Sequence, residues 1–356
     1  MRILIATGGT GGHIFPALKV AQVLKERGHT VIFAGVLGMA EDQIISAGFD
    51  LINIRAKGFN PRSLIGMISF GWLMTLAVIR SFGIVRQIKP DKVIGFGGYG
   101  SFPILSAAWG LRYPIMIHEQ NVFPGKANKL MARFAKIIAV SFKDSEHYFK
   151  GNKTVLTGCP CHSTKTAMGA GEIRKKFGLD PYKKTILLLG GSQGSQKLNG
   201  VMFDFMRYHH EGKTIQAIHM TGKNEYERYV ESYKQEQLPV AVCAFISNID
   251  EAYQAADVII ARAGASSVTE IGLLGLPAVL VPYPFAGGHQ RYNAKVLERL
   301  GNAIIVEQEA LTVDTLQQAV GKMSNAHLPR AVLQERIKGV LLPNAAIILA
   351  DTLEHL

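Results

Sequence analysis

The amino-acid sequence predicts an α/β protein built from two Rossmann-like, doubly wound domains. Short apolar runs with the character of buried strands are each followed by a glycine-rich loop and then by helical periodicity, which is the pattern of parallel βα units. The pattern begins at residue 3 and begins afresh near Thr185. Because domains usually hold ~100–200 residues, a chain of 356 residues has room for one such domain in each half.

The first βα unit lies at the N-terminus. We expect a buried strand over residues 3–6, a glycine-rich loop over residues 7–13, and a helix over residues 14–27 that is closed by Gly28. Pro16 is expected in the first turn of this helix, where proline is tolerated.

Further strands give each half a sheet of its own. In the first half they are expected at residues 30–34, 92–94 and 113–118, and in the second half at residues 186–189, 215–220, 240–245, 258–262 and 278–282. The predicted domains are residues 1–157 and residues 158–335, with a hinge in the Gly- and Pro-containing stretch 157–178. A last helix over about residues 328–355 is expected to cross back, so that residues from about 336 to 356 pack on the first domain.

Composition excludes several function classes. The 39 Lys and Arg against 27 Asp and Glu give a net charge of +12, which favours anionic partners. Nucleic acid is not expected, because the basic residues are spread along the chain without a zinc-finger or RNA-binding motif. The three cysteines, Cys159, Cys161 and Cys243, fit neither a disulfide framework nor a metal site. The N-terminus lacks the apolar core of a signal peptide, so a cytoplasmic protein is expected.

Three glycine-rich loops carry the clearest chemical signal. They follow the strands that end near residues 6, 94 and 189. Between a strand and a helix, such a loop lets backbone N–H groups approach a phosphate, and the helix dipole adds positive potential. A single loop of this kind is as readily a tight turn. Three of them at strand ends favour a diphosphate ligand.

The middle loop leaves a second interpretation open. Gly95-x-Gly97-x-x-Gly100 matches the dinucleotide fingerprint, and Glu119 follows at a strand end, as in an NAD-dependent oxidoreductase. The match is weak, because Phe102-Pro103 follows at once and the first loop lacks the expected spacing.

The stretch between Arg62 and Arg80 has no charged residue and is rich in large apolar side chains. It is shorter than the ~20 residues that span a bilayer, so a buried core helix is one interpretation. Cations flank it on both sides, which favours an interfacial anchor over residues 64–79 on an anionic membrane surface. The flanking cations are Arg55, Lys57, Arg62, Arg80, Arg86 and Lys89.

Five motifs together resemble the MurG family, the undecaprenyldiphospho-muramoylpentapeptide β-N-acetylglucosaminyltransferases of peptidoglycan synthesis. The motifs are Gly8-Gly9-Thr10-Gly11-Gly12-His13-Ile14-Phe15-Pro16-Ala17, His118-Glu119-Gln120-Asn121, Gly190-Gly191-Ser192-Gln193-Gly194, Arg262-Ala263-Gly264-Ala265-Ser266-Ser267-Val268-Thr269-Glu270, and His289-Gln290-x-x-Asn293-Ala294. They are spread over nearly the whole chain and occur in order, which is far more specific than any one alone.

The resemblance implies a GT-B fold, with two Rossmann-like domains facing across a cleft, and transfer of GlcNAc from UDP-GlcNAc to a polyprenyl-diphosphate-linked muramoyl-pentapeptide. The lipid acceptor would bind the N-terminal domain, with its diphosphate on Gly97, Gly98, Tyr99, Gly100 and Ser101. The donor-binding residues it implies are Thr10, Gly11, Gly12, Asn121, Ser192, Ile246, Ala265, Ser266, Ser267, Val268, Thr269, Glu270, Gln290 and Asn293. Peripheral attachment to the cytoplasmic face of the inner membrane, and cell-wall synthesis proteins as partners, follow from the same resemblance.

One position departs from the family pattern. Where the family shows Asn-Pro-x-Arg, with the Arg on the donor nucleotide, this chain has Cys159-Pro160-Cys161-His162. His162 would serve that contact as a weaker, pH-dependent donor.

An inverting transfer needs one direct displacement and a base on the acceptor hydroxyl. His13 is the first candidate base and Glu119 the second, although His13 could instead cap a helix or contact a phosphate. The charge on the leaving group would be stabilised by loop N–H groups, so no cofactor or metal is expected.

Glu270 is expected on the ribose of UDP, but Ser267-x-x-Glu270 also has the spacing of a capping box. A sugar-nucleotide epimerase and a noncatalytic membrane-docking protein remain alternatives.

Overall fold

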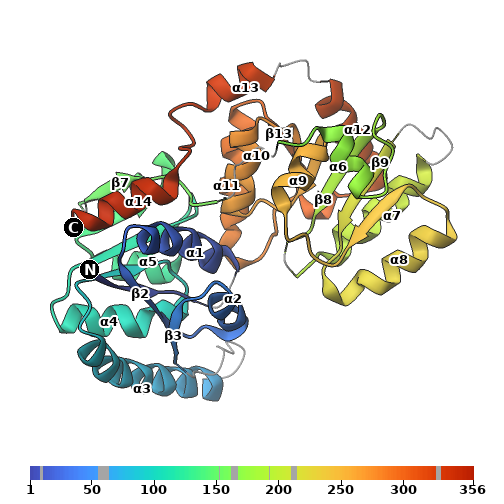
Figure 1. Cartoon of the computed structure of the whole chain (residues 1–356). Helices are drawn as coiled ribbons and strands as arrows, with labels where there is room; N and C mark the ends of the chain where they lie inside the picture. The colour runs from blue at the N-terminus through green and yellow to red at the C-terminus, as the bar shows by residue number, and fades with distance from the viewer. Residues whose placement is uncertain are drawn as a thin grey trace. The chain divides into compact units, whose positions relative to one another are not determined.

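The computed structural model describes residues 1–8, 11–54, 64–151, 153–161, 167–191, 193–209, 215–325 and 330–356. The chain divides into two compact units. The first is Met1–Cys161 together with Leu342–Leu356, and the second is His162–Leu341. Each unit contains one parallel sheet covered by helices (Figure 1).

In the first unit, the described residues form a seven-stranded sheet in the order β3-β2-β1-β4-β5-β6-β7. Its strands are β1 Arg2–Ala6, β2 Thr30–Gly35, β3 Asp50–Asn53, β4 Lys92–Gly95, β5 Ile115–Glu119, β6 Ile137–Val140 and β7 Thr154–Leu156. Its helices are α1 Gly11–Glu26, α2 Glu41–Ser46, α3 Leu64–Ile88, α4 Phe102–Gly110, α5 Lys126–Met131 and α14 Ala345–Glu354, with short 3₁₀ turns at Gly38–Ala40, Tyr99–Ser101 and Lys143–Phe149.

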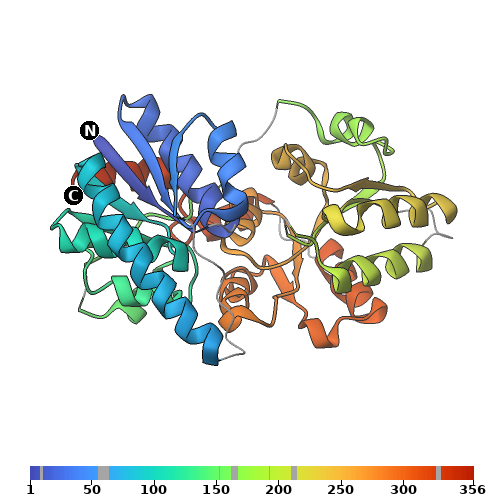
Figure 2. The same ribbon diagram turned by 90° about the horizontal axis from the view of Figure 1, so that it is seen from below.

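Alternation along the strands places the two faces of this sheet against different helices. Ile3 and Ile5 face a core completed by α1 and α14, whereas Leu4 and Ala6 face a core completed by α3, α4 and α5. Such alternation is the period-2 pattern of a sheet that is buried on both faces. The long helix α3 runs along the outside of the unit beside α4 (Figure 2).

The second unit repeats this plan with a six-stranded parallel sheet among its described residues, in the order β10-β9-β8-β11-β12-β13. The strands are β8 Lys184–Leu189, β9 Ile215–Met220, β10 Val240–Cys243, β11 Val258–Ala261, β12 Ala278–Leu280 and β13 Ala303–Ile305. The helices are α6 Ala170–Lys176, α7 Gln196–Tyr208, α8 Tyr226–Gln235, α9 Ile249–Ala255, α10 Ala265–Leu274, α11 His289–Arg299, α12 Val313–Asn325 and α13 Arg330–Ile337, with 3₁₀ turns at Lys223–Glu225, Ala286–Gly288 and Gln308–Ala310.

Strand order fixes where ligands can bind. In the first unit the order reverses between β1 and β4, whose last residues Ala6 and Gly95 are paired. In the second unit it reverses between β8 and β11, where Leu189 is paired with Ala261. Open α/β sheets bind ligands at the carboxyl ends of strands at such reversals. The predicted glycine-rich loops follow β1, β4 and β8, so all three lie at these two places.

Two helices differ from the sequence prediction. Helix α1 begins at Gly11, inside the glycine run, rather than at residue 14. Pro16 therefore lies in the second turn and not in the first, and its missing N–H leaves the carbonyl of Gly12 without its intrahelical donor.

The single C-terminal helix expected over residues 328–355 is wrong. The structure has two helices there, α13 in the second unit and α14 in the first. Gly339 and Asn344 between them have φ of +78° and +61°, a conformation that ends a helix. Helix α14 then packs against α1, and Arg27 lies 2.7 Å from Asp351 of α14.

Candidate functional site

In the first unit, the loops after β1 and β4 pack backbone against backbone. A methyl group on Gly100 would lie 2.8 Å from the carbonyl oxygen of Val36 and 3.1 Å from Cα of Gly8. A methyl group on Gly98, whose φ is +76°, would lie 3.2 Å from Cδ2 and 3.5 Å from Nε2 of His13. Only glycine fits at these positions, and the packing brings His13 against the loop that is predicted to receive the acceptor diphosphate.

His13 is half-buried in the first turn of α1. Its Nδ1 lies 3.2 Å from Oε1 of Gln120, which follows β5. Its Cδ2–Nε2 edge faces Gly98, as the distances above indicate. The structure therefore places the first candidate base at the junction of the loops after β1, β4 and β5.

Behind Gln120 lies a second histidine. Nε2 of Gln120 donates to the carbonyl oxygen of Phe96 at 2.9 Å and lies 3.3 Å from Nδ1 of His118. Nε2 of His118 donates to the carbonyl oxygen of Gly158 at 3.0 Å. Complete burial lowers the pKa of His118 to about 4, with the positive charge of His13 as a smaller contribution and the bond to Gly158 opposing the shift.

Glu119, the second candidate base, holds its own loop together. Oε1 accepts from the backbone N–H of Asn121 at 2.9 Å and from the Asn121 side chain at 3.2 Å. Oε2 accepts from the N–H of Gly125 at 3.0 Å and from the side chain of Asn128 at 2.9 Å. The residue is 1% exposed. This arrangement favours a structural role for Glu119, and it argues against the dehydrogenase alternative, in which the carboxylate would bind a ribose.

The predicted acceptor loop, residues 97–101, is partly committed to its own fold. Ser101 is fully buried, and its hydroxyl and its N–H both donate to the carbonyl oxygen of Gly98, at 2.9 and 3.3 Å. Tyr99 is 46% exposed and makes an edge-to-face contact with Phe70 of α3. Ser101 therefore closes the turn, while Gly98 and Tyr99 form its accessible part.

In the second unit, the loop after β8 has the same close packing. A methyl group on Gly194, whose φ is +76°, would lie 2.1 Å from the carbonyl oxygen of Thr221 after β9. Ser195 follows as the residue before α7. The predicted diphosphate contact, Ser192, lies outside the described residues, as do Thr10 and His162.

Arg262, which directly follows β11, connects the loops after β8, β12 and β13. One terminal nitrogen donates to the carbonyl oxygens of Val281 and Pro282 at 3.1 and 3.3 Å, and the other lies 2.7 Å from Oγ of Ser195 and 2.5 Å from Oε1 of Gln308. Burial lowers the pKa of Arg262, and within the part of the chain that the structure describes no carboxylate pairs with it. The sequence motif contained Arg262, but sequence reasoning gave it no role.

The start of helix α10 excludes one of the two interpretations of Glu270. The helix begins at Ala265 after the cap residue Gly264, so Ser267 is its third residue and Glu270 its sixth. The capping-box interpretation is therefore wrong, because it needs Ser267 before the helix. Glu270 is 7% exposed, and its Oε2 accepts from the hydroxyl of Tyr253 at 2.8 Å.

The neighbouring predicted donor residues differ in what they present. Ala265, Ser266 and Ser267 form the first turn of α10, whose N–H groups have no intrahelical acceptors. Val268 and Thr269 are 0% and 1% exposed, so their side chains face the core. Ile246, which follows β10, is 7% exposed. At Val268, Thr269 and Ile246 the side chain is buried, so a ligand contact at these positions would go to the backbone.

Gln290 and Asn293 on α11 have different roles. Oε1 of Gln290 accepts from the N–H groups of Ala263 and Tyr283, at 3.1 and 2.9 Å, which fixes the orientation of the amide. Its NH₂ group has no hydrogen-bond partner among the described residues, so it is available to sugar hydroxyls. Asn293 is fully buried and donates to the carbonyl oxygen of Ala263 at 3.2 Å, and so acts on the loop rather than at the surface.

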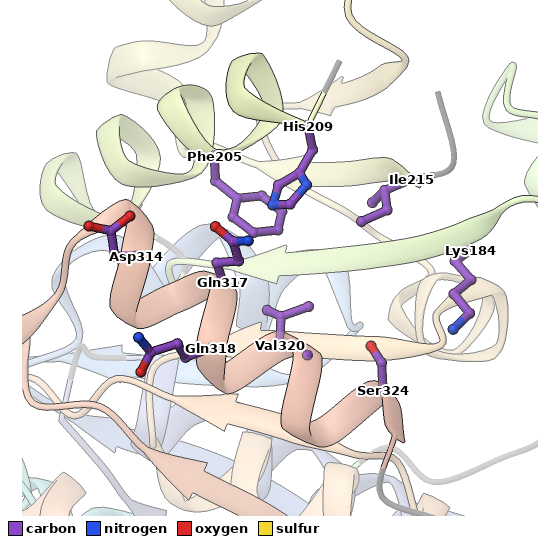
Figure 3. Close-up of a pocket in the computed structure, with 10 residues that line it drawn as sticks. Lys184, Phe205, His209, Ile215, Asp314, Gln317, Gln318, Val320 and Ser324 are labelled. Carbon is purple, nitrogen blue, oxygen red and sulfur yellow. The ribbon is translucent and has the colours of Figure 1, made fainter. Parts of the chain in front are cut away.

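A pocket of about 690 Å³ lies elsewhere in the second unit (Figure 3). Lys184 and Ile215, the first residues of β8 and β9, line it together with His209 and the α12 residues Asp314 and Gln317. It therefore lies at the amino ends of the strands, away from the glycine-rich loops. Among the described residues, no group of three or more His, Cys, Asp or Glu side chains is arranged to hold a metal ion.

Comparison with known families gives two matches that together cover most of the chain. The glycosyltransferase family 28 N-terminal domain matches residues 3–140, and the glycosyltransferase family 28 C-terminal domain matches residues 185–339.

Curated relatives match the chain over about nine tenths of both lengths. The chain is 36% identical over 329 residues to a protein of Thermoanaerobacter sp. (strain X514), covering 90% of each chain. It is 37% identical over 318 residues to a protein of Coxiella burnetii (strain RSA 493 / Nine Mile phase I), covering 89% of this chain and 88% of that protein. Both are named UDP-N-acetylglucosamine--N-acetylmuramyl-(pentapeptide) pyrophosphoryl-undecaprenol N-acetylglucosamine transferase.

Solved structures agree with these matches. Acinetobacter baumannii MurG is similar with a TM-score of 0.76 and 28% identity, over 100% of this chain and 99% of that chain. The calicheamicin glycosyltransferase CalG4 (TM-score 0.71, 14% identity, 99% and 97% of the two chains) and S. aureus MnaA with UDP (TM-score 0.67, 12% identity, 100% and 96%) share the fold alone. With both family domains matched and relatives of equal length above 30% identity, the chain has the GT-B fold and belongs to glycosyltransferase family 28.

Proposed function

We propose that this protein transfers N-acetylglucosamine from UDP-GlcNAc to undecaprenyl-diphospho-N-acetylmuramoyl-pentapeptide during peptidoglycan synthesis. The observation that carries the proposal is the 36% identity, over 90% of the chain, to a relative that bears this activity in its name. The glycine-rich loops at the two strand-order reversals support it, because both substrates carry a diphosphate.

The proposed reaction is a single displacement. The oxygen of the acceptor hydroxyl forms a bond to C1 of GlcNAc while the bond from C1 to the diphosphate oxygen breaks, and the electron pair leaves with UDP. The hydroxyl proton passes to Nε2 of His13. One displacement at C1 converts the α-linked donor into a β-linked product, so no covalent enzyme intermediate is needed.

The second unit supplies the proposed donor site. Arg262 carries a partly buried positive charge that a diphosphate would compensate, and the first turn of α10 adds N–H donors. Glu270 accepts from the ribose hydroxyls, and the amide NH₂ of Gln290 donates to GlcNAc hydroxyls. Because these groups neutralise the leaving UDP, the proposal includes no metal cofactor.

The first unit supplies the proposed acceptor site. The positive-φ residues Gly97 and Gly98 turn the backbone of the loop after β4, and Tyr99 is exposed at its tip. Successive N–H groups in such a turn form an anion-binding concavity for the lipid diphosphate. His13, against Gly98, is then within the same unit as the hydroxyl that it deprotonates.

The test is to incubate purified protein with UDP-GlcNAc and a lipid-linked muramoyl-pentapeptide. Release of UDP together with a β-linked disaccharide on the lipid is the expected result. UDP release without acceptor, or conversion of UDP-GlcNAc to an epimer, would contradict the transferase proposal and favour hydrolysis or the epimerase alternative.

We also propose that α3 holds the protein peripherally on the cytoplasmic face of the inner membrane. Trp72 and Ile79, seven residues apart on one face of α3, are 65% and 62% exposed. Arg86, seven residues after Ile79, continues the same face, and both Arg80 and Arg86 are exposed. An apolar stripe that runs into cations suits an anionic leaflet. None of the helices in the described part of the chain is long and apolar enough to cross a membrane.

Vesicle binding tests this attachment. Binding to phosphatidylglycerol vesicles should be strong at low salt, weaker at high salt and weak to phosphatidylcholine. The double variant Trp72→Ser/Ile79→Ser should lose it, whereas Tyr182→Ser, which removes a 93% exposed aromatic residue of the second unit, should not. Equal binding by wild type and the double variant would exclude α3 as the anchor.

A further inference from the structure

The direction of each hydrogen bond around Gln120 is fixed by the backbone. The carbonyl oxygen of Phe96 can only accept, so the side-chain atom of Gln120 at 2.9 Å from it must be the NH₂ nitrogen. The amide oxygen is then the atom that lies 3.2 Å from Nδ1 of His13. Gln120 is 1% exposed, so packing holds this orientation.

An amide oxygen can only accept, and this settles which nitrogen of His13 carries the proton. Nδ1 must donate to Oε1 of Gln120, so in the neutral ring Nδ1 is protonated and Nε2 holds the lone pair. Histidine side chains in water favour the opposite tautomer, with the proton on Nε2. The contact with Gln120 therefore selects the tautomer that makes Nε2 the basic nitrogen.

His118 holds Gln120 from the other side by the same logic. Its Nε2 must donate to the carbonyl oxygen of Gly158, so its Nδ1 accepts the second amide hydrogen of Gln120. A protonated His118 would carry a hydrogen on Nδ1 and would repel that amide hydrogen. Complete burial, which lowers its pKa to about 4, keeps His118 neutral and accepting at working pH.

The selected nitrogen faces the predicted acceptor loop. A methyl group on Gly98 would lie 3.5 Å from Nε2 of His13, so this edge of the ring lies against the loop after β4 and away from Gln120.

We propose that Gln120 is a positioning residue, which with His118 holds His13 in the tautomer protonated on Nδ1 and so presents Nε2 as the base for the acceptor hydroxyl. The role of His13 as base rests on the proposed function, but its tautomer does not. The proton moves from the acceptor hydroxyl to Nε2, and the resulting imidazolium keeps its Nδ1–H bonded to Gln120. A neutral amide orients the ring without adding a charge that would hold the proton there.

Nitrogen NMR on the full chain, with ¹⁵N-labelled histidine, reads the tautomer directly. Long-range ¹H–¹⁵N correlations at pH 8 distinguish a ring protonated on Nδ1 from one protonated on Nε2, and the signals that vanish in His13→Gln belong to His13. In the wild type we expect the Nδ1–H tautomer. In Gln120→Met, which keeps the volume but removes both hydrogen-bonding ends, we expect the Nε2–H tautomer or a mixture.

Ser141→Ala is the matched control. Ser141 is 1% exposed and its hydroxyl lies 3.3 Å from Nε2 of His118, yet it is not in the path from His118 through Gln120 to His13. This variant should leave the His13 tautomer and the rate unchanged. Gln120→Met should lower kcat by at least ~10-fold and by no more than the ~10²–10⁴-fold that a general base contributes, while KM for UDP-GlcNAc changes little.

A wild-type His13 protonated on Nε2 overturns the proposal, whether or not Gln120→Met folds. An unchanged tautomer in a folded Gln120→Met also overturns it, as does a proportional rise in KM that accounts for the loss of activity. If no transferase activity is found but the wild-type tautomer is Nδ1–H, the assignment of the base fails while the positioning by Gln120 stands.

Discussion

The hydroxyl of Tyr253 in α9 donates a hydrogen bond to Oε2 of Glu270 in α10 over 2.8 Å. This contact holds one oxygen of a carboxylate that lies in the second turn of its helix and not at its cap. Because Glu270 does not cap α10, its role can be separated from the stability of that helix.

Glu270→Gln should leave the melting temperature almost unchanged, because the amide oxygen still accepts from Tyr253. UDP binding should weaken by ~1.5–3 kcal/mol, the usual contribution of hydrogen bonds to a charged group, as measured by calorimetric titration. Tyr253→Phe is the control, because it removes only the hydrogen bond between Tyr253 and Glu270. It should weaken UDP binding much less than Glu270→Gln does. Unchanged UDP affinity with a clear fall in thermal stability would assign Glu270 to structure.

His13→Ala should lower turnover by ~10²–10⁴-fold with a modest change in donor affinity, because a general base acts on the rate. His147→Ala removes an exposed histidine of the same unit and should have no effect. A near-normal rate would eliminate His13 as the base. Equal losses of rate and acceptor binding would instead indicate a phosphate contact.

Arg262→Met should weaken UDP binding by ~1.5–3 kcal/mol and leave uridine binding nearly unchanged, because the diphosphate supplies the charge that the guanidinium faces. Calorimetric titrations with both ligands measure this difference. Arg291→Met is the control, since Arg291 is 61% exposed and pairs with Glu307. Parallel losses for UDP and uridine would show that Arg262 only supports the loops around it.

Acid should lower the free energy of unfolding of both units, because each contains a buried histidine, His118 in the first and His219 in the second. Burial lowers the pKa of His118 to about 4 and that of His219 to about 3, against about 6.5 in the unfolded chain. The unfolded chain takes up the proton first, so this stability is present above pH 6.5 and is lost as the pH falls toward those values. Each group should contribute about 2 kcal/mol of destabilisation between pH 7.5 and 5.

Urea unfolding at pH 7.5 and at pH 5 measures the effect. His219→Gln should flatten the pH dependence of the transition that reports on the second unit, because glutamine can still hydrogen-bond to Tyr233 and Asn199 without titrating. An unchanged slope in this variant would mean that His219 does not couple protonation to unfolding.

Sequence patterns predicted the glycine-rich loops and the strands beside them because these follow from local spacing, but they missed the strands β3, β6, β7 and β13. Ile3 to Ala6, for example, alternate between two buried faces of one sheet, and a run of that kind is visible without tertiary information. The glycine-rich loops lie after β1, β4 and β8, as predicted, because strand ends and glycines are both local signals.

Tertiary packing decided what the sequence left open. Helix α10 begins after Gly264, whose backbone is extended, and no residue pattern specified this start. Glu270 therefore lies in the second turn of the helix and not at its cap. Gln120 gained a role only because β4 and β5 are neighbours, so that the carbonyl of Phe96 orients its amide. The break between α13 and α14 lies between Gly339 and Asn344, and here the sequence did carry a local signal, because Gly339, Pro343 and Asn344 are residue types that end helices or lie outside them.

The return of residues 342–356 to the first unit has a consequence for biosynthesis. Leu349 and Leu353 of α14 are fully buried in the core that contains Ile3 and Ile5, so the first sheet lacks part of one covering layer until these residues are present. On the ribosome they emerge after the whole second unit. The N-terminal domain therefore remains partly uncovered while the second domain is translated and can fold. Domains usually complete their folding in N-to-C order, and here that order is reversed. An N-terminal fragment ending near residue 161 would remain in that uncovered state and would need the C-terminal helix supplied to it.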